Sequence, residues 1–190
     1  TLWTDDAPGG GGAFAASQAG DDSYYRMEAT EREGADPPAV DPTVLADRNA
    51  LAVDALLTYH GYVGDERSRR YAERALESVL ELVDDEGAVA HYPDEGSPRG
   101  TLLDQARVLT GLTTAGQVLG ERGPADAVAD WTIENLGEGG PLRDGPPEDV
   151  GLLDRPLYPL DSAVEFADAA LDLAALTGED RYREAARRAV

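Results

Sequence analysis

GDERSRRYAERAL, residues 64–76, recurs near the end of the chain as GEDRYREAARRAV, residues 178–190. A weaker third copy, GERGP, begins halfway between them at Gly120, so the sequence repeats with a period of about 57 residues. A period of this size usually indicates stacked supersecondary units. Each copy follows one apolar helical pattern and opens another, which predicts that the repeating unit is a helical hairpin.

Three such hairpins can be traced from Asp41 to the C-terminus. The first helix of each pair carries many small and apolar residues, whereas the second carries Arg and Glu on one face. This contrast is typical of an inner ring of buried helices surrounded by an outer ring of amphipathic ones. The sequence therefore predicts an all-α fold of helical hairpins that form part of an (α/α)6 toroid, with short β-hairpin loops. An open solenoid of helix pairs would give a similar pattern.

Local signals give the expected element boundaries. Helices are expected to begin at Asp41-Pro42, Asp65, Gly100-Thr101, Pro124 and Asp161-Ser162, and directly after Gly178. Short extended pieces are expected at residues 13–18, 23–27 and 88–92, and a Gly/Pro-rich loop at residues 137–149.

These boundaries divide the chain into two parts. Residues 1–40 are expected to be an irregular loop segment that packs on the helices, with a disordered tail as the alternative. Residues 41–190 are expected to be three helical hairpins of a single partial toroid domain.

The charge of the chain is strongly one-sided. Its 190 residues include 38 acidic residues and 16 basic ones, all Arg, which gives a formal net charge of −22. An acidic excess without Lys resembles that of halophilic archaeal proteins, since concentrated salt screens the repulsion between carboxylates. An acidic mesophilic protein is the alternative. Either origin argues against binding to nucleic acid or to an anionic membrane, because no basic patch is present.

Several other features limit the function classes. The chain contains no Cys, and its two His are His60 and His91, so disulfides and thiolate sites are excluded and a His-rich metal site is not expected. We therefore expect no cofactor and no metal. The sequence has neither a membrane-spanning apolar run nor a visible signal peptide, which predicts a cytoplasmic protein. It starts without Met and stops within a helical pattern, so we expect a fragment whose ring is completed by missing segments or by self-association.

Polar residues gather where the three inner helices are expected to start. They are Asp47, Arg48 and Asn49 in the first, Asp104 and Gln105 in the second, and Asp161, Ser162 and Glu165 in the third. If the inner helices run parallel, these starts meet at one end of the ring. Carboxylates, amides and Tyr suit a polyhydroxylated ligand. The alternative is that Asp104 and Asp161 only cap their helices.

Several motifs along the chain resemble one family when taken in order. They are residues 11–18, Tyr24-Tyr25, residues 40–50, residues 102–106 and residues 176–182. Together they resemble the uncharacterised thioredoxin-domain-containing family that includes the spermatogenesis-associated proteins. Each motif is weak by itself. Together the motifs cover nearly the whole chain, and their order makes the resemblance more specific.

The resemblance implies a thioredoxin-like domain with a Cys-x-x-Cys-type motif, followed by an (α/α)6 toroid similar to six-hairpin glycosidases and N-acylglucosamine 2-epimerases. This chain would be the C-terminal portion, without the thioredoxin-like domain. Two departures stand out. His60 and His91 do not match the paired His of the epimerases, and the family's Gly-Asn-Ser-like segment is Leu160-Asp161-Ser162-Ala163 here.

We therefore expect a domain that binds or processes carbohydrate, as a glycosidase or as a sugar epimerase or isomerase. Asp104, Asp161 and Asp47 are the predicted catalytic residues, since glycoside hydrolysis needs a pair of carboxyl groups. The predicted substrate-binding residues are Tyr24, Tyr25, Arg48, Asn49, Gln105, Glu165 and His91. The alternative is a non-catalytic helical scaffold or interaction module that accompanies a thioredoxin-like domain.

Overall fold

The fold consists mainly of helical hairpins, in a computed structural model that describes residues 2–137, 140–147 and 155–190. The three hairpins are α3–α4, α5–α6 and α7–α8. Their helices span Ala46–Val63 (α3), Glu66–Leu80 (α4), Leu102–Leu119 (α5), Ala125–Leu136 (α6), Leu160–Thr177 (α7) and Asp180–Ala189 (α8). The predicted fold class is confirmed: the chain is all-α, with hairpins that form part of a toroid and a small sheet beside them.

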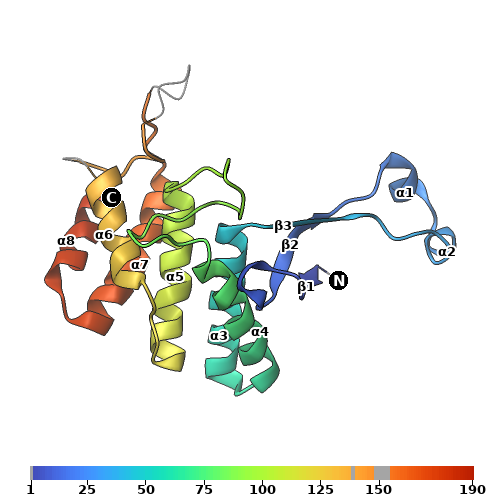
Figure 1. The fold of residues 1–190 in the computed structure, drawn as a ribbon, viewed down its shortest axis with the longest axis horizontal. Coiled ribbons are helices and arrows are strands. Elements are labelled where there is room, and N and C mark those ends of the chain that lie inside the picture. Colours follow the sequence, from blue (N-terminus) through green and yellow to red (C-terminus); the bar gives the residue numbers. More distant parts are fainter. Residues whose placement is uncertain (1, 138–139, 148–154) are drawn as a thin grey trace.

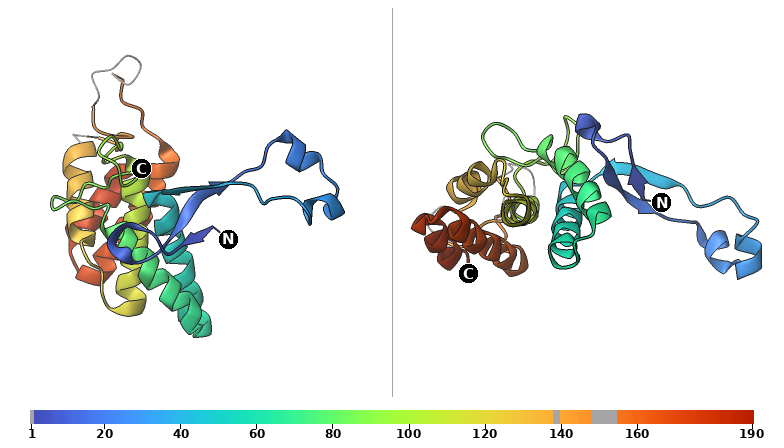
Figure 2. Two further views of the ribbon diagram at one scale, coloured as in Figure 1. Left: turned by 45° about the vertical axis from the view of Figure 1, so that its right-hand side comes forward. Right: turned by 90° about the horizontal axis from the view of Figure 1, so that it is seen from below.

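The helices lie in two layers (Figures 1 and 2). Helices α3, α5 and α7 pack side by side in one layer, and α4, α6 and α8 each pack against the inner helix that precedes them. The core lies between the layers and includes Leu109, Phe166 and Tyr182, all of which are fully buried. The inner helices run parallel, so their first turns meet at the upper end in Figure 1.

The glycine of each repeat ends an inner helix. Gly64, Gly120 and Gly178 follow α3, α5 and α7 with φ angles of 74°, 81° and 77°. This left-handed conformation is easy for glycine and is common directly after a helix, where it turns the chain sharply. In the first copy the next residue, Asp65, caps α4 by accepting a hydrogen bond from the Ser68 amide at 2.7 Å. The repeat therefore encodes the hairpin turn.

The N-terminal residues form a small antiparallel sheet with a projecting arm. Strands β1 (Trp3–Thr4), β2 (Ala13–Gln18) and β3 (Val40–Val44) pair in that order, with the 3-10 turn η1 (Pro8–Gly10) between β1 and β2. Two short helices, α1 (Asp22–Arg26) and α2 (Ala29–Arg32), lie between β2 and β3. They sit at the far end of the arm, away from the helical layers (Figure 1).

Three boundary predictions were wrong. Asp41-Pro42 does not start a helix, because these residues belong to β3 and pair with β2, so α3 begins only at Ala46. Residues 23–27 are not extended, because Asp21 accepts a hydrogen bond from the Tyr24 amide and starts α1. Asp161 does not cap α7, which begins one residue earlier, after Pro159. At Asp41 and Asp161 the predictions relied on local capping signals. In the structure Asp41 lies in a strand, and Asp161 lies inside the first turn of α7.

Two other predictions were confirmed in part. Residues 88–92 form only isolated bridges, Val83 with Val89 and Ala90 with Arg99, rather than a strand. The predicted loop at residues 137–149 is irregular at Gly137 and residues 140–147, and the rest of it lies outside the described residues.

Gly87 fixes how the loop between α4 and α5 lies against α6. It has a φ of 99°, and a Cβ atom at this position would overlap the carbonyl group of Ala127.

We therefore expect Gly87→Ala to lower the free energy of unfolding by about 2 kcal/mol, from backbone strain and displacement of α6. Denaturant titration measures this change. Gly96→Ala is the matched control, because Gly96 lies in open space in the same loop and its substitution should change stability by less than about 0.5 kcal/mol. Equal effects of the two substitutions would contradict the prediction.

Candidate functional site

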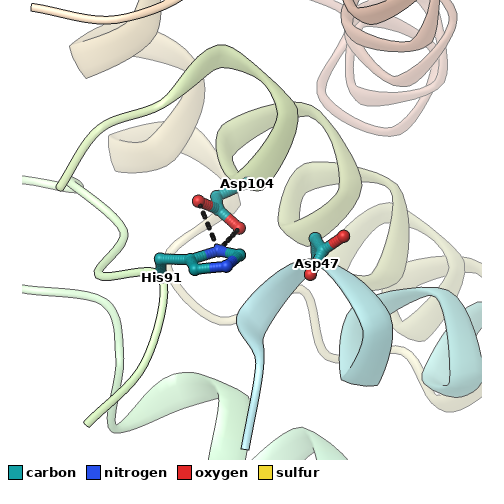
Figure 3. A group of neighbouring side chains, drawn as sticks. All are labelled: Asp47, His91 and Asp104. Carbon is teal, nitrogen blue, oxygen red and sulfur yellow. Dashed lines mark hydrogen bonds and ion pairs between the residues drawn. The ribbon is translucent and has the colours of Figure 1, made fainter. Parts of the chain in front are cut away.

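Three acid–base groups meet beside the first turns of α3 and α5 (Figure 3). Asp47 lies in the first turn of α3, Asp104 in the first turn of α5, and His91 in the loop before α5. One ligand atom from each of them lies within 4.8 Å of the other two. We call this group the Asp47–His91–Asp104 cluster. Asp47 and Asp104 are buried, whereas the His91 side chain is 32% exposed.

Asp104 orients the His91 ring. His91 Nδ1 lies 2.9 Å from Oδ1 and 3.1 Å from Oδ2 of Asp104, and Asp104 Oδ2 also accepts a hydrogen bond from Thr101 Oγ1 at 2.6 Å. Because Asp104 accepts a hydrogen bond from Nδ1, the nitrogen left to meet a ligand is Nε2. Figure 3 shows the ring between the two carboxylates, with its second nitrogen on the side of Asp47.

The backbone of the loop places His91 at the start of α3. The His91 amide donates to the Pro98 carbonyl at 2.9 Å, and the His91 carbonyl accepts from the Ala46 amide at 2.9 Å. Deeper in the loop, Gln105 accepts from the Val89 amide at 2.7 Å and donates to the Gly87 carbonyl at 3.1 Å. Gln105 is fully buried, so its amide holds the loop and thereby positions His91.

Arg107 connects the N-terminal parts of all three inner helices. Its Nη1 donates to Asp47 Oδ2 at 2.9 Å, and its Nε donates to Glu165 Oε2 at 2.9 Å. The hydrogen bond that Arg107 donates to Glu165 is the largest cause of a raised pKa of the Arg107 guanidinium, which therefore stays charged. We call Asp47, Arg107 and Glu165 the Arg107 bridge. It shares Asp47 with the cluster, so the two form one continuous polar site.

The structure brings together four of the residues that the sequence singled out. Asp47, His91, Asp104 and Glu165 belong to the cluster or to the Arg107 bridge. Asp161 lies in the first turn of α7 with an exposed side chain.

Three other predicted residues hold parts of the fold together. Asn49 clamps β2 by accepting from the Phe14 amide at 2.7 Å and donating to the Phe14 carbonyl at 3.0 Å. Arg48 donates to the Ala16 carbonyl at 2.7 Å, and Gln105 holds the loop as described above. The side chains of Arg48, Asn49 and Gln105 thus bind other parts of the protein.

The two predicted tyrosines lie far from the cluster. Tyr24 and Tyr25 belong to α1, at the end of the arm in Figure 1. Their rings pack edge to face with centroids 6.1 Å apart, and the Arg32 guanidinium lies over Tyr24. The structure does not bring them to the inner-helix starts.

Sequence reasoning missed Arg107. It is the only basic residue of α5, and Asp104 is the only acidic one. A charged residue inside an otherwise apolar inner helix needs a partner, because unpaired charge is costly to bury. That signal was present, but the partners lie on α3 and α7 and are distant in sequence.

Further carboxylates continue down the inner helices from this site. Asp54 of α3 accepts a hydrogen bond from Thr114 of α5 at 2.7 Å. On α7, burial raises the pKa of Asp172, and the nearby charges of Asp168 and Asp54 raise it further. The surface between α3 and α7 is therefore acidic and lined with hydrogen-bonding groups beyond the first turn.

Cavities also lie elsewhere in the described chain. One of about 470 Å³ is lined by the sheet and by α3 and α4, with Trp3, Phe14, Tyr59 and Tyr71 in its wall. Another of about 240 Å³ lies between α6 and α8. The α6–α8 cavity also has titratable groups in its wall, from two neighbouring helices. The cluster and the Arg107 bridge combine groups from all three inner helices and from a loop, so we treat them as the candidate site.

No known family model and no curated protein sequence matches the chain. Solved structures do match. A GH76 α-mannanase from Bacteroides thetaiotaomicron is 16% identical with a TM-score of 0.73, over 99% of this chain and 49% of that one. An inactive variant of the GH76 α-1,6-mannanase from Salegentibacter sp., in complex with α-1,6-mannotriose, is 15% identical with a TM-score of 0.64, over 76% and 45% of the respective chains.

A more distant neighbour is a metagenome-derived family 9 endoglucanase, with 18% identity and a TM-score of 0.53 over 98% of this chain and 42% of that chain. At these identities the comparisons show the fold alone: the chain shares the helical-hairpin architecture of these structures. It spans about half the length of these structures. They give no support to the resemblance to the thioredoxin-domain family or to a halophilic origin, which both stay predictions. None of the helices in the described chain is long and apolar enough to cross a membrane.

Proposed function

We propose that this chain is a carbohydrate-binding part of a glycosidase-like toroid, and that its ligand meets the end where α3, α5 and α7 begin. The observation that carries the proposal is the convergence of the cluster and the Arg107 bridge from all three inner helices. Carboxylates accept hydrogen bonds from sugar hydroxyls, and a guanidinium donates to ring and hydroxyl oxygens. The glycosidase-like fold supports this choice of ligand.

The burial of each group indicates its role. Asp104 is 1% exposed, so it would act as a positioning residue for His91 rather than touch the ligand. His91 and Glu165 have the most open side chains of the site, at 32% and 38%. We propose that these two side chains contact the sugar and that Arg107 holds Glu165 in place.

A catalytic role for Asp47, Asp104 and Asp161 stays a prediction. The Salegentibacter variant named as inactive has two adjacent aspartates replaced by asparagine. In this chain the adjacent pairs are Asp5-Asp6, Asp21-Asp22 and Asp84-Asp85, and none of these residues belongs to the cluster or to the Arg107 bridge. We therefore propose that the chain binds carbohydrate. That it also processes the bound carbohydrate is a second step of the proposal. A scaffold that accompanies a thioredoxin-like domain remains the alternative, and no comparison favours it.

Glycan titration tests this proposal. Calorimetry with α-1,6-mannotriose and a panel of other oligosaccharides, in molar salt to screen the large negative charge, should find at least one saturable ligand. Glu165→Gln should weaken its affinity at least tenfold. The matched control is Asp85→Asn, which removes one charge from an exposed turn outside the site. The absence of binding to every glycan, or equal affinities of the two variants, would refute the proposal.

A further inference from the structure

We propose that the Asp47–His91–Asp104 cluster binds one divalent transition-metal ion. The three ligand atoms come from α3, from the loop before α5 and from α5 itself, and they lie within 4.8 Å of one another. One imidazole nitrogen and two carboxylate oxygens form a donor set that Zn²⁺ accepts, usually with a fourth position left for water or substrate. The sequence had predicted no metal, because two His and no Cys argue against a His-rich or thiolate site.

An unsatisfied oxygen supports the proposal independently. Asp47 Oδ1 is buried and has no hydrogen-bond partner within the described chain, while Oδ2 is bound by Arg107. The Asp47 side chain is only 9% exposed. A buried carboxylate oxygen without a donor is unfavourable, and a bound cation would remove that cost. Figure 3 shows one oxygen of Asp47 directed toward His91, on the inside of the cluster.

The local charge also favours a dication. The cluster and the Arg107 bridge together contain three carboxylates, Asp47, Asp104 and Glu165, and Arg107 neutralises one of them. Two negative charges are left if His91 is neutral, as a metal ligand must be. A divalent ion would neutralise them.

The geometry requires the ligands to close around the ion. In a tetrahedral Zn²⁺ site with bond lengths of about 2.0–2.2 Å, the ligand atoms lie about 3.3–3.6 Å apart, so a pair at the 4.8 Å limit would have to approach by more than about 1 Å. His91 Nδ1 and Asp104 Oδ1 already lie 2.9 Å apart, and the ion would bind Nδ1 in place of the proton between them, which leaves Nε2 free for another ligand. The fourth position would then face solvent on the side of His91, where an ion and a ligand oxygen can enter.

Zinc titration of EDTA-treated protein, without any glycan, tests the proposal separately from the proposed function. In molar NaCl, which suppresses unspecific binding to the acidic surface, calorimetry should find one equivalent of Zn²⁺ per chain. Asp47→Asn should weaken the affinity at least tenfold, and Asp85→Asn should leave it unchanged. Because Asn fits the same space, the folding of Asp47→Asn can be checked by thermal unfolding.

The two histidines provide a second readout. Zn²⁺ should shift the imidazole NMR signals of His91 and leave those of His60, in the last turn of α3, unchanged. No stoichiometric binding, equal affinities of the two variants, or an unshifted His91 at saturation would overturn the proposal. Mn²⁺ serves as a second probe, and its binding with the same variant pattern would support the site.

Discussion

Gln105→Ala is expected to lower the free energy of unfolding by about 4 kcal/mol. The side chain is fully buried, and its Oε1 accepts from the Val89 amide while its Nε2 donates to Gly87 and Thr132. Alanine would leave these buried groups without partners and would also leave a cavity. Each unpaired group costs about 1–3 kcal/mol, which makes this one of the largest effects available in the chain.

Denaturant unfolding of Gln105→Ala and Gln117→Ala measures the effect with a matched control. Gln117 lies on the same helix with an exposed side chain that hydrogen-bonds to Asp172, so its substitution should change stability by about 1 kcal/mol or less. Gln105→Met keeps most of the volume without the hydrogen bonds, so its stability should fall between that of the wild type and that of the alanine variant. If Gln105→Ala were as stable as Gln117→Ala, the assigned role of Gln105 as the clamp of the His91 loop would be wrong.

Arg107→Leu is expected to lower the free energy of unfolding by about 3 kcal/mol. The substitution removes the partner of a buried carboxylate, so both oxygens of Asp47 would lack a donor within the described chain. Glu165 is more exposed and can be solvated, so most of the effect comes from Asp47. Added salt should recover little of this loss, because a buried charge is poorly screened.

Thermal or denaturant unfolding measures this loss, with Arg187→Leu as the matched control. Arg187 is 75% exposed and lies 3.7 Å from Glu184, so its removal should change stability by less than about 0.5 kcal/mol. Arg107→Lys should recover only part of the stability, since one ammonium group cannot reproduce the paired hydrogen bonds to Glu165. An Arg107→Leu protein as stable as the control would show that the bridge does not hold the inner helices.

The repeat made much of the fold predictable. A glycine that ends one helix and an acidic residue that begins the next form a local signal, and Gly64, Gly120 and Gly178 each end an inner helix as that signal indicates. Parallel inner helices then bring their first turns together. For this reason Asp47, Asp104 and Glu165 could be selected from the sequence although 38 acidic residues are present.

The errors arose where partners distant in sequence decide the structure. Asp41-Pro42 has the local form of a helix start, but pairing with β2 places it in a strand. Tyr24 and Tyr25 were expected at the site because of their side-chain chemistry, yet the arm carries them away from it. Arg107 was missed because its two partners lie 60 and 58 residues away along the chain. Such contacts are not visible in local patterns.

The most direct test of the proposed ligand site uses the two histidines as reporters in one protein. His91 lies at the inner-helix starts, whereas His60 lies at the opposite end of α3. When the tightest glycan of the panel is added to saturation, the imidazole NMR signals of His91 are expected to shift and those of His60 to stay in place, with His91→Gln providing the assignment. Saturation with His91 unshifted, or with only His60 shifted, would contradict a ligand site at the starts of the inner helices.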